Sequence, residues 1–397
     1  MKVSIEKFLT TPTDLEALEY VSKGGEGSIY RLGVSSMLGK IYHQENLDRQ
    51  RQEKVLDLCS RYDTFSHLLS KEDFAFPEKT AKDENNNIVG FAMKEFENYV
   101  RLDEIFWKGD EFTEAGGKKL TEQDALKLIY DLYAFLLRLH KSRIVIGDLN
   151  PSNILYNFSS KKPAFIDLDS VQIDQFGCRV IGEDSRYLDP QVEANGINVD
   201  GCFRYTEDSD CFALAIIACE LLTGGDPYMF KTSPPMDPSE RRRKRISIIG
   251  YLEDSDFGSR NGQNLLDNKS NVKRLARFDA IRKKDPLLYR YLREVLLGDE
   301  RENLLTKLPK TDKRHPEYAI RKNIRTIMDV RHPARPIDFS SVQTSAINEA
   351  GKKAIENILN AAGLKKNLRL CAMSTEDPDG FKMFLETFNL GHLLIGA

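Results

Sequence analysis

The sequence predicts an α+β protein with two lobes, a small β-rich lobe followed by a larger, mainly helical lobe with a cleft between them. The first hundred residues contain short apolar runs separated by glycine and asparagine turns, the pattern of strands. From Thr121 the apolar residues recur at helical spacing. A later segment, SDCFALAIIACELLTGG, is apolar almost all round, which is typical of a helix buried in a large domain.

The composition is that of a globular protein and excludes several classes. Hydrophobic residues make up 41% of the 397 residues and charged residues 30%, and the net charge of -3 argues against general nucleic-acid binding. The six cysteines form no C-x-x-C pair, which is typical of reduced intracellular thiols. The first residues contain no apolar signal-peptide core, and no run is long enough to span a membrane. We expect a soluble cytoplasmic protein.

Each element of the small lobe has a local signal. SIYRLG and MLGKIYH resemble two strands joined by a short turn, and IVGFAMKEF resembles a strand that follows the turn DENNN. Between them, the charged segment that begins at Asn46 has helical character. The small lobe is therefore expected to be a sheet with one helix.

The elements of the large lobe are also marked at their ends. Thr121 and Asp124 form a capping box that begins a helix, and Gly224 follows the last residue of the buried helix as a C-cap. Another helix is expected from Asp285, whereas residues 229–275 and 300–340 look irregular. An amphipathic helix is predicted from Ala346.

Two features of the small lobe suit phosphate binding. The run SKGGEGSIY carries Gly24, Gly25 and Gly27, which let backbone N–H groups approach phosphate oxygens without a side chain in the way. Lys40 lies in an otherwise apolar strand, where an ammonium is costly unless an anion is near. Glu53, in the following helix, is the candidate anion. Each feature alone is equally compatible with an ordinary hairpin and a solvated edge lysine.

The stronger signal is IGDLNPSNIL followed by FIDLDS. Asp148 comes directly after a β-run, and Asn153 follows it across a proline-containing loop. The spacing to Asp167 leaves room for one hairpin, so Asp167 could meet Asn153 across two short strands. Carboxylate and amide oxygens are ligands that Mg²⁺ prefers. Glycines, a lysine and this set of oxygens are the parts that phosphoryl transfer requires.

Together these motifs resemble the protein-kinase-like superfamily over roughly residues 20–230. The resemblance implies a bilobal protein-kinase-like fold, with an N-lobe at residues 1–97, a C-lobe at 98–340 and a C-terminal extension at 341–397. The details look most like a bacterial Ser/Thr-kinase-like group related to kinases that carry helix-hairpin-helix DNA-binding domains. No helix-hairpin-helix signature is found here, so DNA binding is not expected.

The resemblance also implies ATP and Mg²⁺ as cofactors and assigns roles to residues. Asp148 would orient the acceptor hydroxyl, Lys40 would contact phosphates, and Glu53 would pair with Lys40. Asp210 corresponds to the buried acid that opens the helix in SDCFALA. The implied nucleotide contacts are Gly24, Gly25, Gly27, Lys40, Met93 and Phe96, and the implied metal ligands are Asn153, Asp167 and Asp169.

Four departures from the family pattern carry consequences. Gly147 replaces the arginine that normally receives an activation-segment phosphate, so we expect activity without that phosphorylation. Asn150 replaces the lysine usual in protein kinases, which leaves a small-molecule acceptor open. Asp169 replaces a glycine and could hold a second metal ion. Gln191 replaces a glutamate, so the usual ion pair with a C-lobe arginine is not expected.

Three functions remain open on the sequence. The first is an ATP- and Mg²⁺-dependent kinase that phosphorylates Ser or Thr of a protein, and the second is a kinase of small-molecule hydroxyls. The third is a nucleotide-binding pseudokinase scaffold. The basic run RRRKR at residues 241–245 is expected to be a solvated face or a docking site for an acidic partner, and the C-terminal tail could also bind a partner.

Overall fold

The computed structural model describes residues 1–33, 36–68, 74–108, 111–179, 186–196 and 202–297. All of them belong to one compact unit, residues 1–308. The irregular stretch expected at 300–340, the helix expected from Ala346 and the extension at 341–397 lie outside the described residues. The predicted boundaries between lobes and extension stay predictions.

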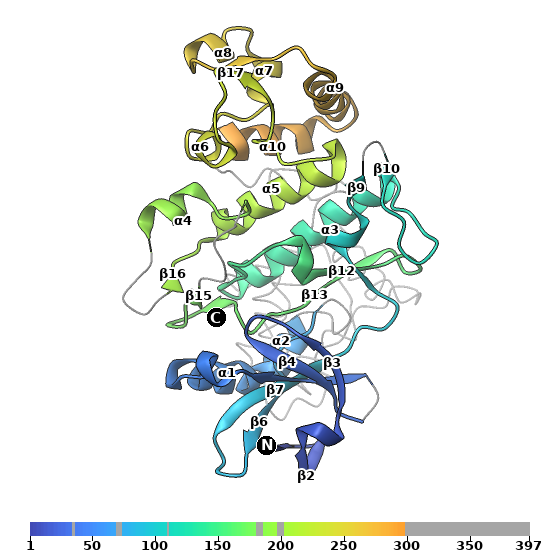
Figure 1. Cartoon of the computed structure of the whole chain (residues 1–397), viewed down its shortest axis with the longest axis vertical. Coiled ribbons are helices and arrows are strands. Elements are labelled where there is room, and N and C mark those ends of the chain that lie inside the picture. The colour runs from blue at the N-terminus through green and yellow to red at the C-terminus, as the bar shows by residue number, and fades with distance from the viewer. Residues whose placement is uncertain (34–35, 69–73, 109–110, 180–185, 197–201, 298–397) are drawn as a thin grey trace, which may run out of the picture. The chain divides into compact units, whose positions relative to one another are not determined.

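The first lobe is built on one antiparallel sheet, drawn in blue to cyan in Figure 1. Its strand order is β2-β1-β6-β7-β5-β4-β3, and apolar side chains from its two faces form two small cores. The predicted strands are present as β4, β5 and β7. The seven strands are β1 (Lys2–Ile5), β2 (Leu9–Asp14), β3 (Glu19–Lys23), β4 (Gly27–Arg31), β5 (Met37–Tyr42), β6 (Lys79–Asp83) and β7 (Ile88–Lys94).

Gly27 lets β4 approach β5 closely, and its replacement by alanine should be destabilising. A Cβ on Gly27 would lie 2.5 Å from the carbonyl oxygen of Ile41, whereas a Cβ on Gly25 would meet nothing within 4 Å. We expect Gly27→Ala to lower the free energy of unfolding by about 2 kcal/mol, as overpacked sites do. Gly25→Ala, the matched control, should change it by less than about 0.5 kcal/mol. Urea denaturation of both variants measures this difference, and equal effects would contradict the packing role of Gly27.

The predicted helix after β5 is confirmed and begins at a cap. Asp48 accepts a hydrogen bond from the backbone N–H of Arg51 at 2.8 Å, which satisfies one of the free donors of the first turn. The helix α1 (Arg49–Ser60) packs against β6 and β7 and is followed by α2 (Tyr62–Leu68).

The second lobe is mainly helical and forms around the long helices α3 and α5, which pack against each other. The α3 helix begins at Thr121, whose hydroxyl accepts the N–H of Asp124 at 3.0 Å, and α5 ends at Gly224, which has a left-handed φ of 80°. Every residue of α5 from Ser209 to Leu221 is buried, as its sequence predicts. The helices are α3 (Glu122–Lys141), α4 (Pro190–Asn195), α5 (Glu207–Thr223), α6 (Pro238–Arg243), α7 (Gly250–Glu253), α8 (Phe257–Arg260), α9 (Lys269–Lys284) and α10 (Pro286–Leu297).

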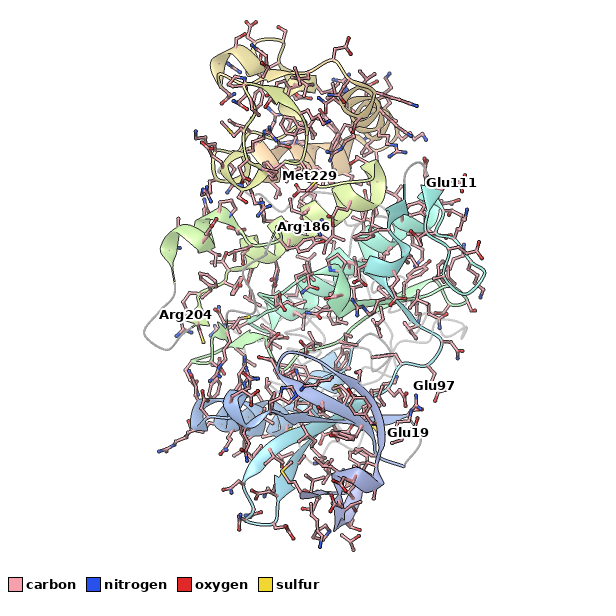
Figure 2. The ribbon with its side chains drawn as sticks, in the orientation of Figure 1. Glu19, Glu97, Glu111, Arg186, Arg204 and Met229 are labelled. Carbon is pink, nitrogen blue, oxygen red and sulfur yellow. The ribbon has the colours of Figure 1, made fainter. Side chains whose placement is uncertain are left out.

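The expectation of an irregular segment at residues 229–275 is wrong in part. The segment contains α6, α7, α8 and the first turns of α9, together with the short pair β17 (Thr232–Ser233) and β18 (Asn264–Leu265). Many charged residues mask the helical pattern of α9, since only one face of it is buried. Elsewhere in the segment, exposed apolar side chains, such as that of Met229 (labelled in Figure 2), obscure the difference between buried and exposed positions. The helix expected from Asp285 is confirmed as α10.

Short strand pairs lie between the two lobes' main elements and position the site. The hairpin of β12 (Ile154–Asn157) and β13 (Lys162–Phe165) is extended by β8 (Val100–Arg101). The other pairs are β11 (Ile144–Val145) with β14 (Gln172–Ile173), β15 (Cys178–Arg179) with β16 (Cys202–Phe203), and β9 (Trp107–Lys108) with β10 (Glu111–Phe112). The α+β class and the two-lobed arrangement expected from the sequence, a β-rich lobe followed by a mainly helical one, are confirmed. Among the helices of the described ranges, none combines the length and apolar character that crossing a membrane requires.

Candidate active site

Lys40 lies at the centre of a buried ionic cluster. Its side chain is 6% exposed, and its Nζ lies 2.9 Å from both carboxylate oxygens of Asp169 and 3.5 Å from Glu26. Asp167 accepts a further short hydrogen bond from the same Nζ. Burial lowers the pKa of Lys40, but the attraction of the three carboxylates outweighs burial, and the pKa is raised. Lys40 is therefore held as an ammonium.

Glu53 is not the partner of Lys40, contrary to the expectation from the sequence. Its carboxylate is 53% exposed and pairs with Arg49 on the same helix at 2.8 Å. The helical period explains the error, because the inward face of α1 is set by its buried positions and Glu53 lies away from that face. The buried positions of α1 are Arg51, Lys54, Val55 and Leu58. The helix thus sends two cations and no carboxylate inward.

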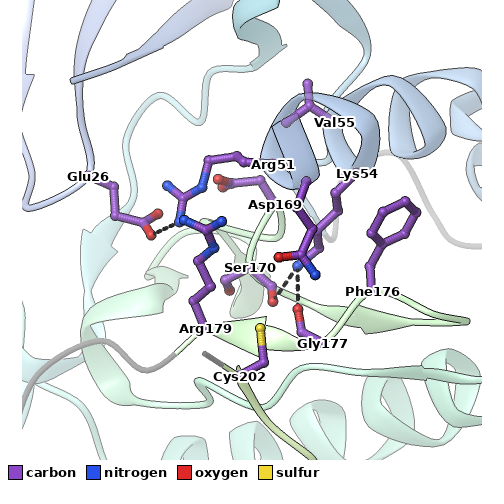
Figure 3. Close-up of a pocket in the computed structure, with 11 residues that line it drawn as sticks. Glu26, Arg51, Lys54, Val55, Asp169, Ser170, Phe176, Gly177, Arg179 and Cys202 are labelled. Carbon is purple, nitrogen blue, oxygen red and sulfur yellow. Dashed lines mark hydrogen bonds and ion pairs between the residues drawn. The ribbon is translucent and has the colours of Figure 1, made fainter. Parts of the chain in front are cut away.

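Arg51 and Lys54 connect α1 to the site through other partners. Arg51 pairs with Glu26, and its guanidinium lies 4.8 Å from the centre of the Tyr42 ring. Lys54 donates hydrogen bonds to the backbone carbonyls of Ser170 at 2.9 Å and Gly177 at 3.1 Å (Figure 3). Arg51 therefore holds the tip of the glycine-rich loop. Lys54 holds the last residue of FIDLDS and the segment that follows it.

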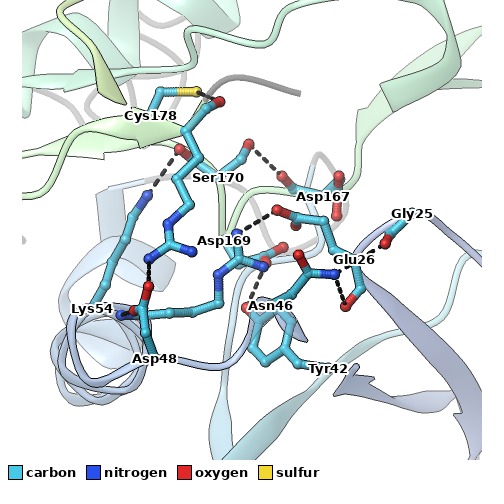
Figure 4. Close-up of polar contacts among 12 residues, drawn as sticks. Gly25, Glu26, Tyr42, Asn46, Asp48, Lys54, Asp167, Asp169, Ser170 and Cys178 are labelled. Atoms are coloured by element: carbon cyan, nitrogen blue, oxygen red, sulfur yellow. Dashed lines mark hydrogen bonds and ion pairs between the residues drawn. The ribbon is translucent and has the colours of Figure 1, made fainter. Parts of the chain in front are cut away.

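Asp169 is buried behind Lys40 and has two partners. Besides the contacts with Lys40, its Oδ2 accepts a hydrogen bond of 2.5 Å from the hydroxyl of Tyr42 (Figure 4). Burial alone raises the pKa of Asp169, but Lys40 and Tyr42 overcome this and the pKa is lowered. Asp169 is therefore ionised, with both oxygens engaged by the protein.

The β12–β13 hairpin brings Asp167 to Asn153, as the spacing predicted. Ile154 is paired with Phe165 across the hairpin, and the backbone N–H of Ile166 donates to the carbonyl of Asn153 at 3.0 Å. Asp167 has a left-handed φ of 60°, which is uncommon for a residue other than glycine and is found at functional sites. Burial raises the pKa of Asp167, and Lys40 opposes the rise.

The catalytic-loop candidate Asp148 is held by two amides. Its Oδ1 accepts a hydrogen bond of 3.1 Å from Asn150, and its Oδ2 accepts one of 3.2 Å from Asn153. Burial raises the pKa of Asp148, although both amides act in the opposite direction. Because Asn153 spends its amide N–H₂ on Asp148, the carbonyl oxygen of its side chain is left for another partner.

The turn that carries Asp148 is fixed from below by Asp210. Asp210 is 1% exposed and accepts hydrogen bonds from the backbone N–H groups of Ile146 at 2.8 Å and Gly147 at 2.9 Å. Its Oδ2 also lies 2.9 Å from Nε2 of His140. The buried acid at the start of α5 therefore aligns the loop, and His140 has a structural partner.

The glycine-rich loop closes as a hairpin, with one acid turned inward. The backbone N–H of Gly24 donates to the carbonyl of Gly27 at 2.9 Å, and Asn46 donates to the carbonyl of Gly25 at 3.1 Å. Glu26, between these glycines, directs its carboxylate to Lys40 and Arg51. Sequence reasoning missed Glu26, because the glycines on either side of it were the signal that pointed to phosphate binding.

The two remaining candidates for nucleotide contact, Met93 and Phe96, lie on or close to the same sheet. Met93, on β7, is 8% exposed and packs in a core cluster with Tyr42 and Phe91. Phe96 is half-buried and stacks edge-on with Tyr99 at 5.2 Å between ring centres. Their proposed contact with a nucleotide stays a prediction.

An ion pair joins the segment before α4 to a C-lobe arginine, contrary to the expectation from Gln191. Asp189, two residues earlier, lies 3.7 Å from Arg245 and is buried. The pair forms because the N-cap of α4 is an acid that also accepts the N–H of Gln191 at 2.9 Å.

The same segment also contacts α5, through Arg186, which is labelled in Figure 2. Arg186 pairs with Glu220 at 3.1 Å, and the Tyr187 hydroxyl donates to the same carboxylate at 2.8 Å. Burial raises the pKa of Glu220 to about 7, with Tyr187 and Arg186 opposing the rise. The ion pair and the hydrogen bond to Glu220 of α5 thus hold the segment in place.

The basic run at residues 241–245 is not a fully solvated face. Arg241 is 2% exposed and donates to the carbonyls of Tyr228 at 3.1 Å and Phe230 at 2.7 Å. Arg242 is also buried, whereas Arg243 is exposed. The run therefore contains both buried and solvent-facing side chains, because α6 has one buried side. The interpretation of the run as a solvated face is therefore wrong for Arg241 and Arg242, and docking of an acidic partner stays a prediction.

The donor set suits a magnesium nucleotide and does not form a metal site on its own. Within the described part of the chain, no group of three or more His, Cys, Asp or Glu side chains is arranged to hold a metal ion. Mg²⁺ usually takes one or two protein oxygens and completes its shell with phosphates and water. Asp167 and the side-chain oxygen of Asn153 could provide them, beside the Lys40 ammonium. Asp169, engaged on both oxygens, does not fit the predicted second metal ligand.

Comparison with known proteins points to protein kinases. The chain is 27% identical to the mouse ribosomal protein S6 kinase alpha-6 over 214 residues, which covers 48% of this chain and 27% of that protein. It is 28% identical to an Aurora kinase of Yarrowia lipolytica over 120 residues, covering 28% of each. A probable serine/threonine-protein kinase PknB of Lactococcus lactis is 26% identical over 227 residues, covering 53% of this chain and 32% of that protein.

The chain therefore spans about a third or less of these relatives. No protein-family model matches the sequence. Among solved structures, the Cydia pomonella granulovirus kinase PK-1 has a TM-score of 0.44 and 16% identity, covering 71% of this chain and 86% of that chain. The sequence similarities support a place in the protein-kinase-like superfamily.

Proposed function

We propose that this chain, whose similar proteins are Ser/Thr protein kinases, is an ATP- and Mg²⁺-dependent phosphotransferase that phosphorylates Ser or Thr hydroxyls of a protein. The observation that carries the proposal is the convergence of Lys40, Asp148, Asn153 and Asp167 from three separate segments. Lys40 contacts Asp167, and Asn153 accepts the backbone N–H of Ile166, the residue before Asp167, while its side-chain amide donates to Asp148. Phosphoryl transfer depends on this kind of positioning and charge compensation.

Each side chain then has a task in the reaction. The Lys40 ammonium binds phosphate oxygens, and Asp148 accepts the hydrogen bond of the acceptor hydroxyl and orients it. Asn153 and Asp167 would hold Mg²⁺, which neutralises phosphate charge when it is bound. The raised pKa of Asp148 brings its basicity closer to that of a group that exchanges a proton near neutral pH.

A small-molecule acceptor is the alternative that one contact favours. Asn150, at the position where protein kinases usually have lysine, uses its amide to hold Asp148 at 3.1 Å. It therefore adds no positive charge next to the transferring phosphoryl group. The bacterial group related to helix-hairpin-helix-associated kinases remains the subgroup that the motifs suggest, and a cytoplasmic location remains our proposal.

Labelled ATP tests the proposal directly. Purified protein is incubated with γ-³²P-ATP, Mg²⁺ and a generic protein substrate, and ADP release is followed in parallel. We expect Asp148→Asn to lower the rate about 10³-fold, because the orienting base is removed. Asp279→Asn, which changes a partly exposed carboxylate on α9 paired with Arg282 and Lys283, is the matched control and should retain activity.

The outcomes separate the three functions. Label on protein that is lost in Asp148→Asn supports the protein kinase. ADP release that rises with a library of hydroxylated small molecules, without label on protein, supports the alternative acceptor. Thermal stabilisation by ATP with no transfer in any assay favours the scaffold.

A further inference from the structure

We propose that Asp169 is the positioning residue for Lys40, the task that the sequence led us to expect from a glutamate of α1. This inference rests on the proposed phosphotransfer function. Of the three carboxylates around Lys40, Asp169 alone contacts Nζ with both oxygens, each at 2.9 Å, whereas Asp167 and Glu26 contact it with one oxygen each. Asp169 is also more buried than the other two acids of the cluster, with a side chain 2% exposed against 14% for Glu26 and 31% for Asp167.

The two acids of α1 are engaged elsewhere, and Asp57 pairs with Arg61 at 3.0 Å. The inward face of α1 carries Arg51 and Lys54, and Figure 3 shows both beside Asp169. Glu53 is directed to solvent and to Arg49. The charges at the helix are therefore reversed, and the balancing anion comes from the segment that follows Asp167.

Asp169 is itself fixed by groups other than Lys40. The hydroxyl of Tyr42, two residues after Lys40 on β5, donates to its Oδ2 at 2.5 Å. The next residue, Ser170, is held through its carbonyl by Lys54 at 2.9 Å. A strand thus holds the carboxylate of Asp169 and a helix holds the backbone next to it (Figure 4), so Lys40 receives a preset position.

The same contacts divide the work between the two acids of FIDLDS. Asp167 is partly exposed and has a left-handed backbone, as expected of a group that faces a ligand. Asp169 has no oxygen free of a protein partner, so it does not serve as a ligand of a second metal ion. The aspartate that replaces a glycine here supplies the anchor that the helix lacks.

Steady-state kinetics of four variants tests the inference. We expect Asp169→Asn to lower kcat about 100-fold through misplacement of Lys40, with less than about a threefold change in KM for ATP and in the Mg²⁺ concentration for half-maximal rate. Lys40→Met combined with Asp169→Asn should be no slower than Lys40→Met alone, because both remove the same interaction. Glu53→Gln, the same carboxylate-to-amide change outside the site, should match the unaltered protein.

Several results would overturn the inference. A large loss in Glu53→Gln would return the task to the helix. Additive losses in the double variant, or a strongly raised Mg²⁺ requirement in Asp169→Asn, would show that Asp169 acts on the metal and not through Lys40.

A structure determined with a non-hydrolysable ATP analogue and Mg²⁺ separates this inference from the proposed function. A Lys40–Asp169 contact in a protein that transfers no phosphate would refute only the function. An active protein in which Lys40 pairs with an acid of α1, or in which Asp169 binds a metal ion, would refute only the positioning role of Asp169.

Discussion

Replacing Lys40 with methionine is expected to abolish phosphotransfer and to lower the free energy of unfolding by about 3–5 kcal/mol at pH 8. The side chain of Lys40 is 6% exposed and compensates Asp169, Asp167 and Glu26. Methionine fills a similar volume but leaves these three carboxylates facing one another. Activity should fall by about 10³-fold or more, because phosphate charge is no longer compensated.

The pH dependence of this effect has a definite sign. In the unaltered protein the pKa of Asp169 is lowered, so its ionised form contributes stability above its unfolded pKa, and this is lost as the pH falls through the folded pKa. In Lys40→Met the remaining carboxylates should take up protons more readily. The deficit in stability should therefore be smaller at pH 5 than at pH 8.

Urea denaturation at the two pH values measures this difference. Lys23→Met, on the exposed strand β3, is the matched control and should change stability by less than about 0.5 kcal/mol at either pH. A Lys40→Met protein as stable as the control at pH 8 would mean that the ionic cluster is not formed in solution.

Replacing Asp210 with alanine is expected to lower the free energy of unfolding by about 3–5 kcal/mol. The change leaves the buried N–H groups of Ile146 and Gly147 and the ring of His140 without their acceptor. Each buried donor left unsatisfied costs about 1–3 kcal/mol. Asp148 follows these residues directly, so the folded fraction of the variant should also lose most of its activity.

Asp208→Ala provides the control for this prediction. Asp208 lies in the same first turn of α5 but is exposed, and its loss should cost less than about 1 kcal/mol through the helix dipole. Chemical denaturation gives both values, and activity per folded molecule shows whether the loop is misaligned. Equal stabilities for the two variants would contradict the role assigned to Asp210.

Local patterns were enough to predict the elements that hold the site. The number of residues between Asn153 and Asp167 leaves room for a single hairpin, and β12 and β13 pair there. The cap at Thr121, the stop at Gly224 and the burial of α5 also follow from residues close together in the chain. Such features depend on backbone geometry and on the apolar period, both of which are readable over one or two turns.

The partners of charged side chains were decided only by the tertiary structure. Glu53 is the sole acid between Arg49 and Leu56, yet it lies on the wrong face of α1, and which face packs inward depends on β6 and β7. Lys40 and Asp169 are 129 positions apart, and Asp189 pairs with Arg245, a contact that the sequence did not predict. The sequence by itself determined which segments meet at the site, because periodicity and turns act locally. It did not determine which acid neutralises which base, because a buried charge pairs with whatever opposite charge the packing brings within a few ångströms.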